Sequence, residues 1–221
     1  MKNKKIAIIS PHPDDPEMEM GMKIFDYTQK GHDVYNLVLC EGELGGDPKI
    51  RKEESKKAME ILGVKNTTYH QFPNTLFDEV RNDIKNAIEK EVHKINPDII
   101  YGPWKDDLHI DHRITSQEML VAARSVPVQI YYPCIQSQNF NPNSIFYGNK
   151  KHKDIKLKAI KQHQSQINRG GIDLILCKSS MIYNARTFYA NNFHEKIKKQ
   201  YNLPKKDSLY AEVFKIHKQL L

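Results

Sequence analysis

Long hydrophobic runs are missing from this chain of 221 residues. No apolar stretch approaches the roughly 18 residues that a membrane-spanning helix needs. The opening MKNKKIAIIS is basic, but its four consecutive apolar residues are too few for the hydrophobic region of a secretory signal. We therefore expect a soluble, cytoplasmic protein without a membrane span.

Cysteine is scarce, and Cys40, Cys134 and Cys177 stand far apart in the sequence. An odd number of cysteines without a C-x-x-C pair argues against a disulfide framework and against a structural zinc knot. Cys40 ends a predicted strand and has no base near it in the sequence. We expect it to be a small buried residue rather than a nucleophile.

Acidic residues are outnumbered, 27 against 34 lysines and arginines, which gives a net charge of +7. Much of the excess lies in two lysine-rich stretches, at 150–161 and 196–206. Ile155, Ala159 and Ile160 recur in the first stretch, which favours a solvated helix face over a nucleic-acid footprint. Because no aromatic ladder or zinc-finger motif accompanies the lysines, we expect no nucleic-acid partner.

Short apolar runs alternate with amphipathic segments along the first 133 residues. The patterns predict strands at 5–10, 33–40, 67–72, 98–102 and 128–133, and helices at 17–30, 51–63, 78–95 and 112–124. Apolar strands alternating with helices over short connections are typical of a mainly parallel sheet with right-handed crossovers. The fold class is therefore α/β: a single Rossmann-like domain, 1–221, whose sheet carries helices on both faces.

The rest of the chain has weaker patterns. The segment 134–153 is rich in Asn, Ser, Gln and Gly and is expected to be a loop or an oligomer contact. Residues 154–221 should form one or two helices and a short apolar end, LYAEVF at 209–214.

Glycine is absent from the loop after the first predicted strand and does not occur before Gly21. A dinucleotide site would need G-x-G-x-x-G here, so that backbone amides could approach a pyrophosphate. The loop instead carries Asp14, Asp15 and Glu17, which would repel phosphate. A Rossmann cofactor site is therefore excluded.

Two clusters of histidine and carboxylate follow the first and fourth predicted strands. The first is His12 with Asp14 and Asp15 on a proline-stiffened loop, and the second runs over 106–112. Either alone could be a capped turn or an exposed polar loop. The carboxyl ends of parallel strands share one edge, so the clusters should converge, and two His with one carboxylate is the pattern of catalytic zinc. The spacing leaves open whether Asp14 or Asp15 binds the metal while the other acts as base.

These motifs resemble those of the LmbE-like, or PIG-L-like, metal-dependent de-N-acetylases. The shared patterns are H-P-D-D-x-E within 11–17 and H-x-D-H at 109–112. Further matches are EGELGG at 41–46, Arg51, Glu54, Ala58, Leu62 and Gly63, then Lys156, Ala159, His163, Ser165 and Gln166, and finally YAEVF at 210–214. The chain departs from the family around Gly21, where many relatives have two glycines. Here Glu19 and Met22 flank a single one, which predicts altered helix packing or a Glu19 directed toward the substrate.

The resemblance implies a role for each matching residue. It implies that His12, Asp15 and His112 bind Zn²⁺, with Fe²⁺ as an alternative. It also implies that Asp14 is the general base, and that His109 is the imidazole beside the developing oxyanion, with Asp111 as the hydrogen-bond partner of that imidazole. Arg51 is implied to bind the substrate. The expected reaction is hydrolysis of the N-acetyl group of an N-acetylglucosamine-type amino sugar or glycoconjugate. Assembly into a homo-oligomer, a trimer or hexamer, is a further expectation from the resemblance.

Two other functions stay open at this point. His109 and Asp111 with a distant histidine could form the triad of a non-haem Fe(II) enzyme, although such sites usually lie in β-barrels. A non-catalytic binding module would bind metal, or nucleic acid through the basic surface, without turnover. Replacing Asp14 by Asn separates the alternatives, because a hydrolase should lose turnover and keep its metal.

Overall fold

The computed structural model describes residues 3–192 and 209–219, so the lysines between 196 and 206 lie outside the described residues. The strands are β1 (Lys5–Ser10), β2 (Asp33–Val38), β3 (Asn66–Tyr69), β4 (Ile99–Pro103), β5 (Val128–Tyr132), β6 (Ser144–Gly148) and β7 (Tyr210–Gln219). The helices are α1 (Asp15–Gln29), the 3₁₀ turn η1 (Glu43–Gly45), α2 (Pro48–Ile61), α3 (Arg81–Ile95), α4 (Ile110–Ala122), α5 (Lys150–Ile160), α6 (Gln164–Asn168) and α7 (Leu174–Asn192).

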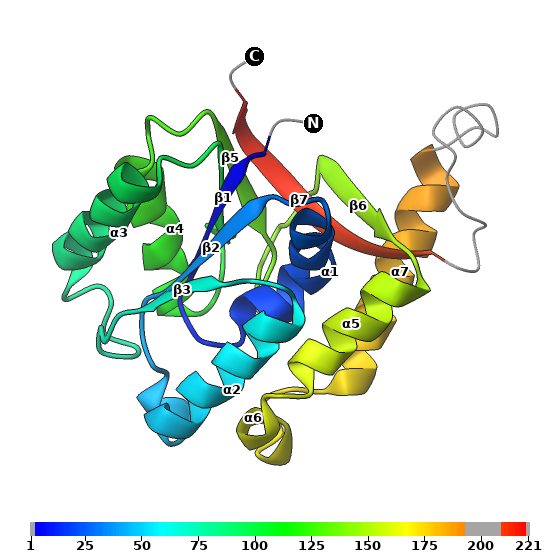
Figure 1. Ribbon diagram of the computed structural model, residues 1–221, viewed down its shortest axis with the longest axis horizontal. Helices are drawn as coiled ribbons and strands as arrows, with labels where there is room; N and C mark the ends of the chain where they lie inside the picture. The colour runs from blue at the N-terminus through cyan, green and yellow to red at the C-terminus, as the bar shows by residue number, and fades with distance from the viewer. Residues whose placement is uncertain (1–2, 193–208, 220–221) are drawn as a thin grey trace.

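The seven strands form one sheet in the order β3-β2-β1-β4-β5-β7-β6 (Figure 1). The strands β1 to β5 pair in parallel, and β7 runs antiparallel to both β5 and β6. This arrangement confirms the predicted α/β, Rossmann-like class with a mainly parallel sheet.

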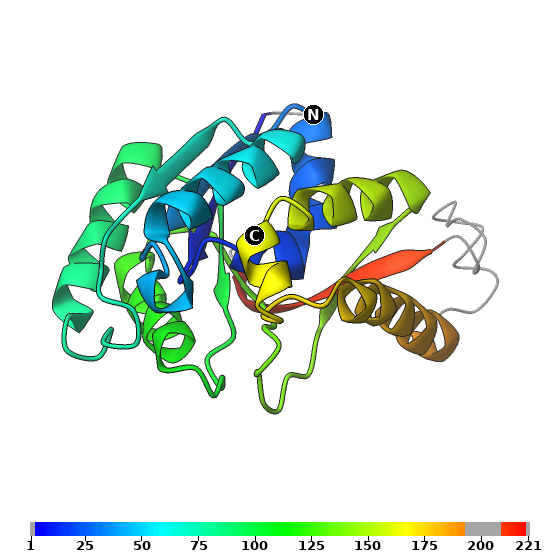
Figure 2. The same cartoon turned by 90° about the horizontal axis from the view of Figure 1, so that it is seen from below.

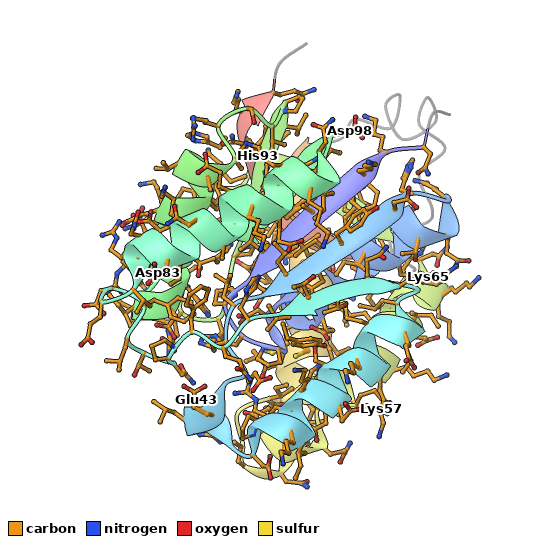
Figure 3. All side chains as sticks on the ribbon, turned by 60° about the vertical axis from the view of Figure 1, so that its left-hand side comes forward. Glu43, Lys57, Lys65, Asp83, His93 and Asp98 are labelled. Atoms are coloured by element: carbon orange, nitrogen blue, oxygen red, sulfur yellow. The ribbon has the colours of Figure 1, made fainter. Side chains whose placement is uncertain are left out.

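Helices cover both faces of the sheet, as the sequence predicts (Figure 2). Along β1, Ile6 and Ile8 pack in the core against α1, α2 and α5, whereas Ala7 and Ile9 pack against α3 and α4. Successive side chains of a strand point to opposite faces, so one apolar strand contributes to both cores. Charged side chains lie on the outer faces of α2 and α3, such as Lys57 on α2 and Asp83 on α3 (Figure 3).

The segment beyond residue 133 departs from the prediction. The expected loop at 134–153 contains β6 and the start of α5, and the apolar end of the chain is a full strand, β7. Strand β6 forms because β7, which comes from the far end of the chain, pairs with it and places Phe214 opposite Ser144. Three helices, rather than one or two, lie between these strands within the described residues.

Helix α1 is bent at Met20, where the backbone leaves helical geometry. The buried carboxylate of Glu212 accepts hydrogen bonds from the amides of Met22 and Lys23, at 2.9 and 2.8 Å, and so caps the second half of the helix. Lys156 of α5 pairs with the same carboxylate at 2.7 Å. This one carboxylate therefore joins α1, α5 and β7.

Gly21 allows α5 to pack closely at this bend. A Cβ there would lie 3.0 Å from Cγ of Lys156. Of the methionines near it, Met20 and Met22 are buried, whereas Met18 is half-buried and lines a cavity. Within the described residues, no helix combines the length and apolarity of a membrane span.

Candidate active site

The two motif clusters meet at one edge of the sheet. His12 and Asp14 lie on the loop after β1, and Asp15 is the first residue of α1. His109 is the N-cap of α4, and His112 lies in its first turn. Strands β1 and β4 are hydrogen-bonded neighbours, so the loops that follow them are adjacent although about 100 residues separate them.

Three donor groups form a triangle at this edge. Nδ1 of His12 lies 3.2 Å from Nε2 of His112, and the Asp15 carboxylate oxygens lie 3.2 Å from the former and 3.5 Å from the latter. With metal–ligand bonds of about 2.0–2.1 Å, the corners of a tetrahedron lie about 3.3–3.4 Å apart. The spacing and the donor set, two imidazoles and one carboxylate, thus fit a zinc-sized cation.

Further carboxylates lie behind two of these ligand candidates. Oδ2 of Asp111 lies 3.2 Å from Nε2 of His12, and Oδ1 of Asp107 lies 3.3 Å from Nδ1 of His112. A carboxylate on the far nitrogen of a histidine fixes the ring and directs the other nitrogen to the metal. Burial works against a charged His12, but the carboxylates of Asp15 and Asp111 outweigh it and raise its pKa to about 9. The site therefore attracts positive charge.

The family resemblance pairs Asp111 with His109, and here the structure differs. The Asp111 carboxylate contacts His12 and accepts a hydrogen bond from the amide of Thr75 at 2.8 Å, while only its backbone N–H donates to Nδ1 of His109, at 3.2 Å. His109 is the N-cap of α4, and its ring nitrogen accepts from the Asp111 amide as an N-cap side chain does. The Asp111 carboxylate therefore contacts a ligand candidate, and its hydrogen bond with His109 runs through the backbone.

The hydrogen bond from the Asp111 amide to Nδ1 favours one tautomer of the His109 ring. With Nδ1 accepting, the neutral ring carries its proton on Nε2. Burial, followed by the nearby His12 and His112, lowers the pKa of His109. The half-buried ring lies 4.7 Å from the His12 ring, centroid to centroid, at the border of the cavity.

Asp14 does not share the donor triangle. Its Oδ1 accepts a hydrogen bond from Nη2 of Arg51 at 3.2 Å, and Nη1 of the same guanidinium donates to the carbonyl of Gly42 at 2.7 Å. Arg51 is buried and lines the cavity beside Asp14. The geometry thus favours Asp15 over Asp14 as the metal-binding carboxylate, the choice that the spacing leaves open.

The sequence motifs do not single out two supporting residues. In the sequence, Asp107 is only one of the acidic residues of the second cluster. Its position just before the H-x-D-H motif is the one signal that could have indicated its supporting role. Thr75 adopts φ 67°, a left-handed conformation that is rare for a β-branched residue. This backbone conformation directs the N–H of Thr75 at the Asp111 carboxylate, and the sequence around Thr75 gives no signal of that contact.

A cavity of about 300 Å³ opens in front of these groups. Its wall includes the polar side chains of Asn74, Gln136 and Arg169. A second cavity, of about 430 Å³, shares Met18, Glu19 and two other residues with the first. Glu19, one of the departures from the family pattern, therefore borders both cavities, and burial raises its pKa to about 8.

Known proteins share both the sequence pattern and the fold. The chain is 32% identical over 171 residues to the uncharacterized deacetylase YaiS of Escherichia coli K12, covering 74% of this chain and 92% of that one. It is 30% identical over 191 residues to the diacetylchitobiose deacetylase of Thermococcus kodakarensis, covering 74% and 70%. The crystal structure of the conserved protein TT1542 from Thermus thermophilus superposes with a TM-score of 0.77 over 99% of this chain and 96% of that one, at 22% identity, which supports the fold.

The family model that matches is described as PIG-L, GlcNAc-PI de-N-acetylase, and it spans residues 7–123. This range contains both clusters of the candidate metal centre and Arg51. The match and the relatives together place the chain in the PIG-L family of de-N-acetylases, hydrolases that act on carbon–nitrogen bonds other than peptide bonds.

Proposed function

We propose that this protein removes the acetyl group from an N-acetylglucosamine-type amino sugar or glycoconjugate, using Zn²⁺, or Fe²⁺ as an alternative, bound by His12, Asp15 and His112. The observation that carries the proposal is the donor triangle of these three residues, with Asp14 and His109 beside it at the same cavity. The substrate class is supported by the diacetylchitobiose deacetylase among the relatives. The family description, which names a GlcNAc-bearing substrate, supports it too.

An amide carbonyl is a poor electrophile, and water is a poor nucleophile at neutral pH. A divalent cation at the donor triangle supplies the missing activation, because it polarises the carbonyl and lowers the pKa of water. His12 and His112 keep a nitrogen free for it because Asp111 and Asp107 contact their opposite nitrogens.

Asp14 is the proposed general base. It lines the cavity next to Asp15 and is held by Arg51 rather than by the donor triangle, so its carboxylate is available to accept the proton of the attacking water. In this arrangement Arg51 positions the base through its contacts with Asp14 and the Gly42 carbonyl.

His109 is the proposed partner of the oxyanion. Its Nδ1 accepts the amide hydrogen of Asp111, so its Nε2–H is the donor available to the carbonyl oxygen as negative charge develops there. This assignment uses a neutral imidazole, whereas pairing with the Asp111 carboxylate would favour a protonated ring. The sugar hydroxyls would meet Asn74, Gln136 and Arg169 on the cavity wall.

The experiment measures release of free amine from a panel of N-acetylglucosamine derivatives by protein reconstituted with Zn²⁺ or Fe²⁺. We expect metal-dependent release, and a loss of about 10²–10⁴-fold in kcat for Asp14→Asn with metal content unchanged. Asp106→Asn is the matched control, because this carboxylate lies on the β4–α4 loop but contacts Lys105 at the surface.

Three results would count against the proposal. Equal kcat for Asp14→Asn and the wild type would remove Asp14 from the mechanism. Stoichiometric metal with no amine released from any substrate would favour a binding module. Consumption of O₂ with Fe²⁺ in place of hydrolysis would favour the oxidative alternative.

A further inference from the structure

A buried thiol lies beside the candidate metal ligands. Sγ of Cys134, a ring nitrogen of His112 and a carboxylate oxygen of Asp15 all lie within 4.8 Å of one another. Cys134 is 7% exposed and borders both cavities. Neither of the other cysteines belongs to such a group within the part of the chain that the structure describes.

The backbone of Cys134 is tied to the same network that holds His112. Its N–H donates to Oγ of Ser137 at 2.9 Å, and the Ser137 hydroxyl donates to Oδ2 of Asp107 at 2.8 Å. The other oxygen of Asp107 lies 3.3 Å from Nδ1 of His112. A bridge between residues 107 and 137 and a bond from the amide of Leu108 to the carbonyl of Gln136, at 3.2 Å, join the two loops further. The backbone of Cys134 is therefore held at a fixed place relative to His112 and the candidate metal ligands.

Because Sγ lies no more than 4.8 Å from the ligand atoms of Asp15 and His112, coordination needs it to move closer by about 1.2 Å or less. For bonds of about 2.3 Å to sulfur and 2.0–2.1 Å to nitrogen or oxygen, neighbouring ligand atoms in a tetrahedron lie about 3.6 Å apart. Rotation about the single χ1 bond of Cys134 changes the position of Sγ without moving the backbone. Burial disfavours a free thiolate here, raising the pKa of Cys134, but a divalent cation deprotonates a thiol that coordinates it.

We propose that Cys134 binds the cation as a fourth protein ligand, next to Asp15 and His112. This inference rests on the proposed metal centre and adds a soft donor to it. Catalytic zinc accepts a fifth ligand during a reaction, so four protein ligands still leave a position for water. Because thiolates favour zinc and copper(I) over hard cations, Cys134 biases the site toward Zn²⁺ and against Mg²⁺.

The test is titration of metal-free protein with Co²⁺, followed by absorption in the near ultraviolet, where a cobalt–thiolate bond gives a charge-transfer band. We expect the band in the wild type and its loss in Cys134→Ser. Cys177→Ser is the matched control, because Cys177 is also 7% exposed and lines the neighbouring cavity, and it should keep the band. Visible bands of bound Co²⁺ should persist in Cys134→Ser, showing that the other ligands still bind.

A second measurement is zinc affinity in competition with a chelator, which Cys134→Ser should weaken by about tenfold or more. Bound Co²⁺ without a thiolate band, or a band that survives in Cys134→Ser, would overturn the inference and leave the proposed deacetylase intact. Absence of any Co²⁺ or Zn²⁺ binding by the wild type would overturn both.

Discussion

The buried pair of Glu212 and Lys156 supports α1, the helix that begins at the proposed metal site, and replacing Glu212 by Gln should be strongly destabilising. The two side chains are 2% and 3% exposed, with Oε1 and Nζ 2.7 Å apart. Removing one charge of a buried pair leaves the other uncompensated, which costs about 3–5 kcal/mol. The substitution also weakens the cap on the amides of Met22 and Lys23.

Equilibrium unfolding in urea measures this loss. For an m-value of about 2 kcal/mol/M, a loss of about 4 kcal/mol lowers the midpoint by about 2 M. Asp154→Asn is the control, because Asp154 pairs with Lys150 at 2.9 Å on the same helix but at the surface, and its midpoint should not move. The double variant Glu212→Gln, Lys156→Met should recover much of the loss, since neither charge of the pair is then left buried without its partner. A midpoint for Glu212→Gln equal to that of the control would refute the reasoning.

Two predictions concern the residues around the proposed metal site. Asp111→Asn should lower zinc affinity about 10–100-fold in chelator competition, because Asp111 directs Nδ1 of His12 to the donor triangle. Unchanged zinc affinity would show that Asp111 does not contribute to metal binding. Gly42→Ala should lower kcat/KM at least about tenfold, because at φ 68° its Cβ would meet the Arg51 guanidinium that contacts Asp14, the proposed base. Its control is Gly31→Ala, which has a similar φ of 77° but open space around the new Cβ; equal kcat/KM for the two variants would show that Arg51 does not position the base.

The convergence of the two motif clusters at one sheet edge could be predicted, because it follows from local signals and one topological rule. The apolar runs before His12 and after Pro97 define neighbouring parallel strands, and the carboxyl ends of such strands share an edge. Motif residues elsewhere, such as Glu54 and His163, have partners that bring α2 and α6 to this region: Glu54 contacts Ser165, and His163 contacts Glu17. The motifs contain these residues without indicating which side chains they contact.

What escaped prediction depends on side-chain direction and on distant pairing. Asp111 contacts His12 because the first turn of α4 directs its side chain away from His109, a difference of angle that residue spacing does not encode. Strand β6 needs a partner strand from the far end of the chain, and its flanks are polar. The position of Cys134 beside His112 likewise arises only when β5 lies next to β4.

Anomalous diffraction at the zinc edge, from crystals of the protein loaded with one equivalent of Zn²⁺, tests the central claim most directly. The donor triangle predicts one strong peak bounded by Nδ1 of His12, Nε2 of His112 and the Asp15 carboxylate. A peak at any other group of residues, or none at these three in zinc-loaded crystals, would contradict the metal centre and the hydrolytic mechanism built on it.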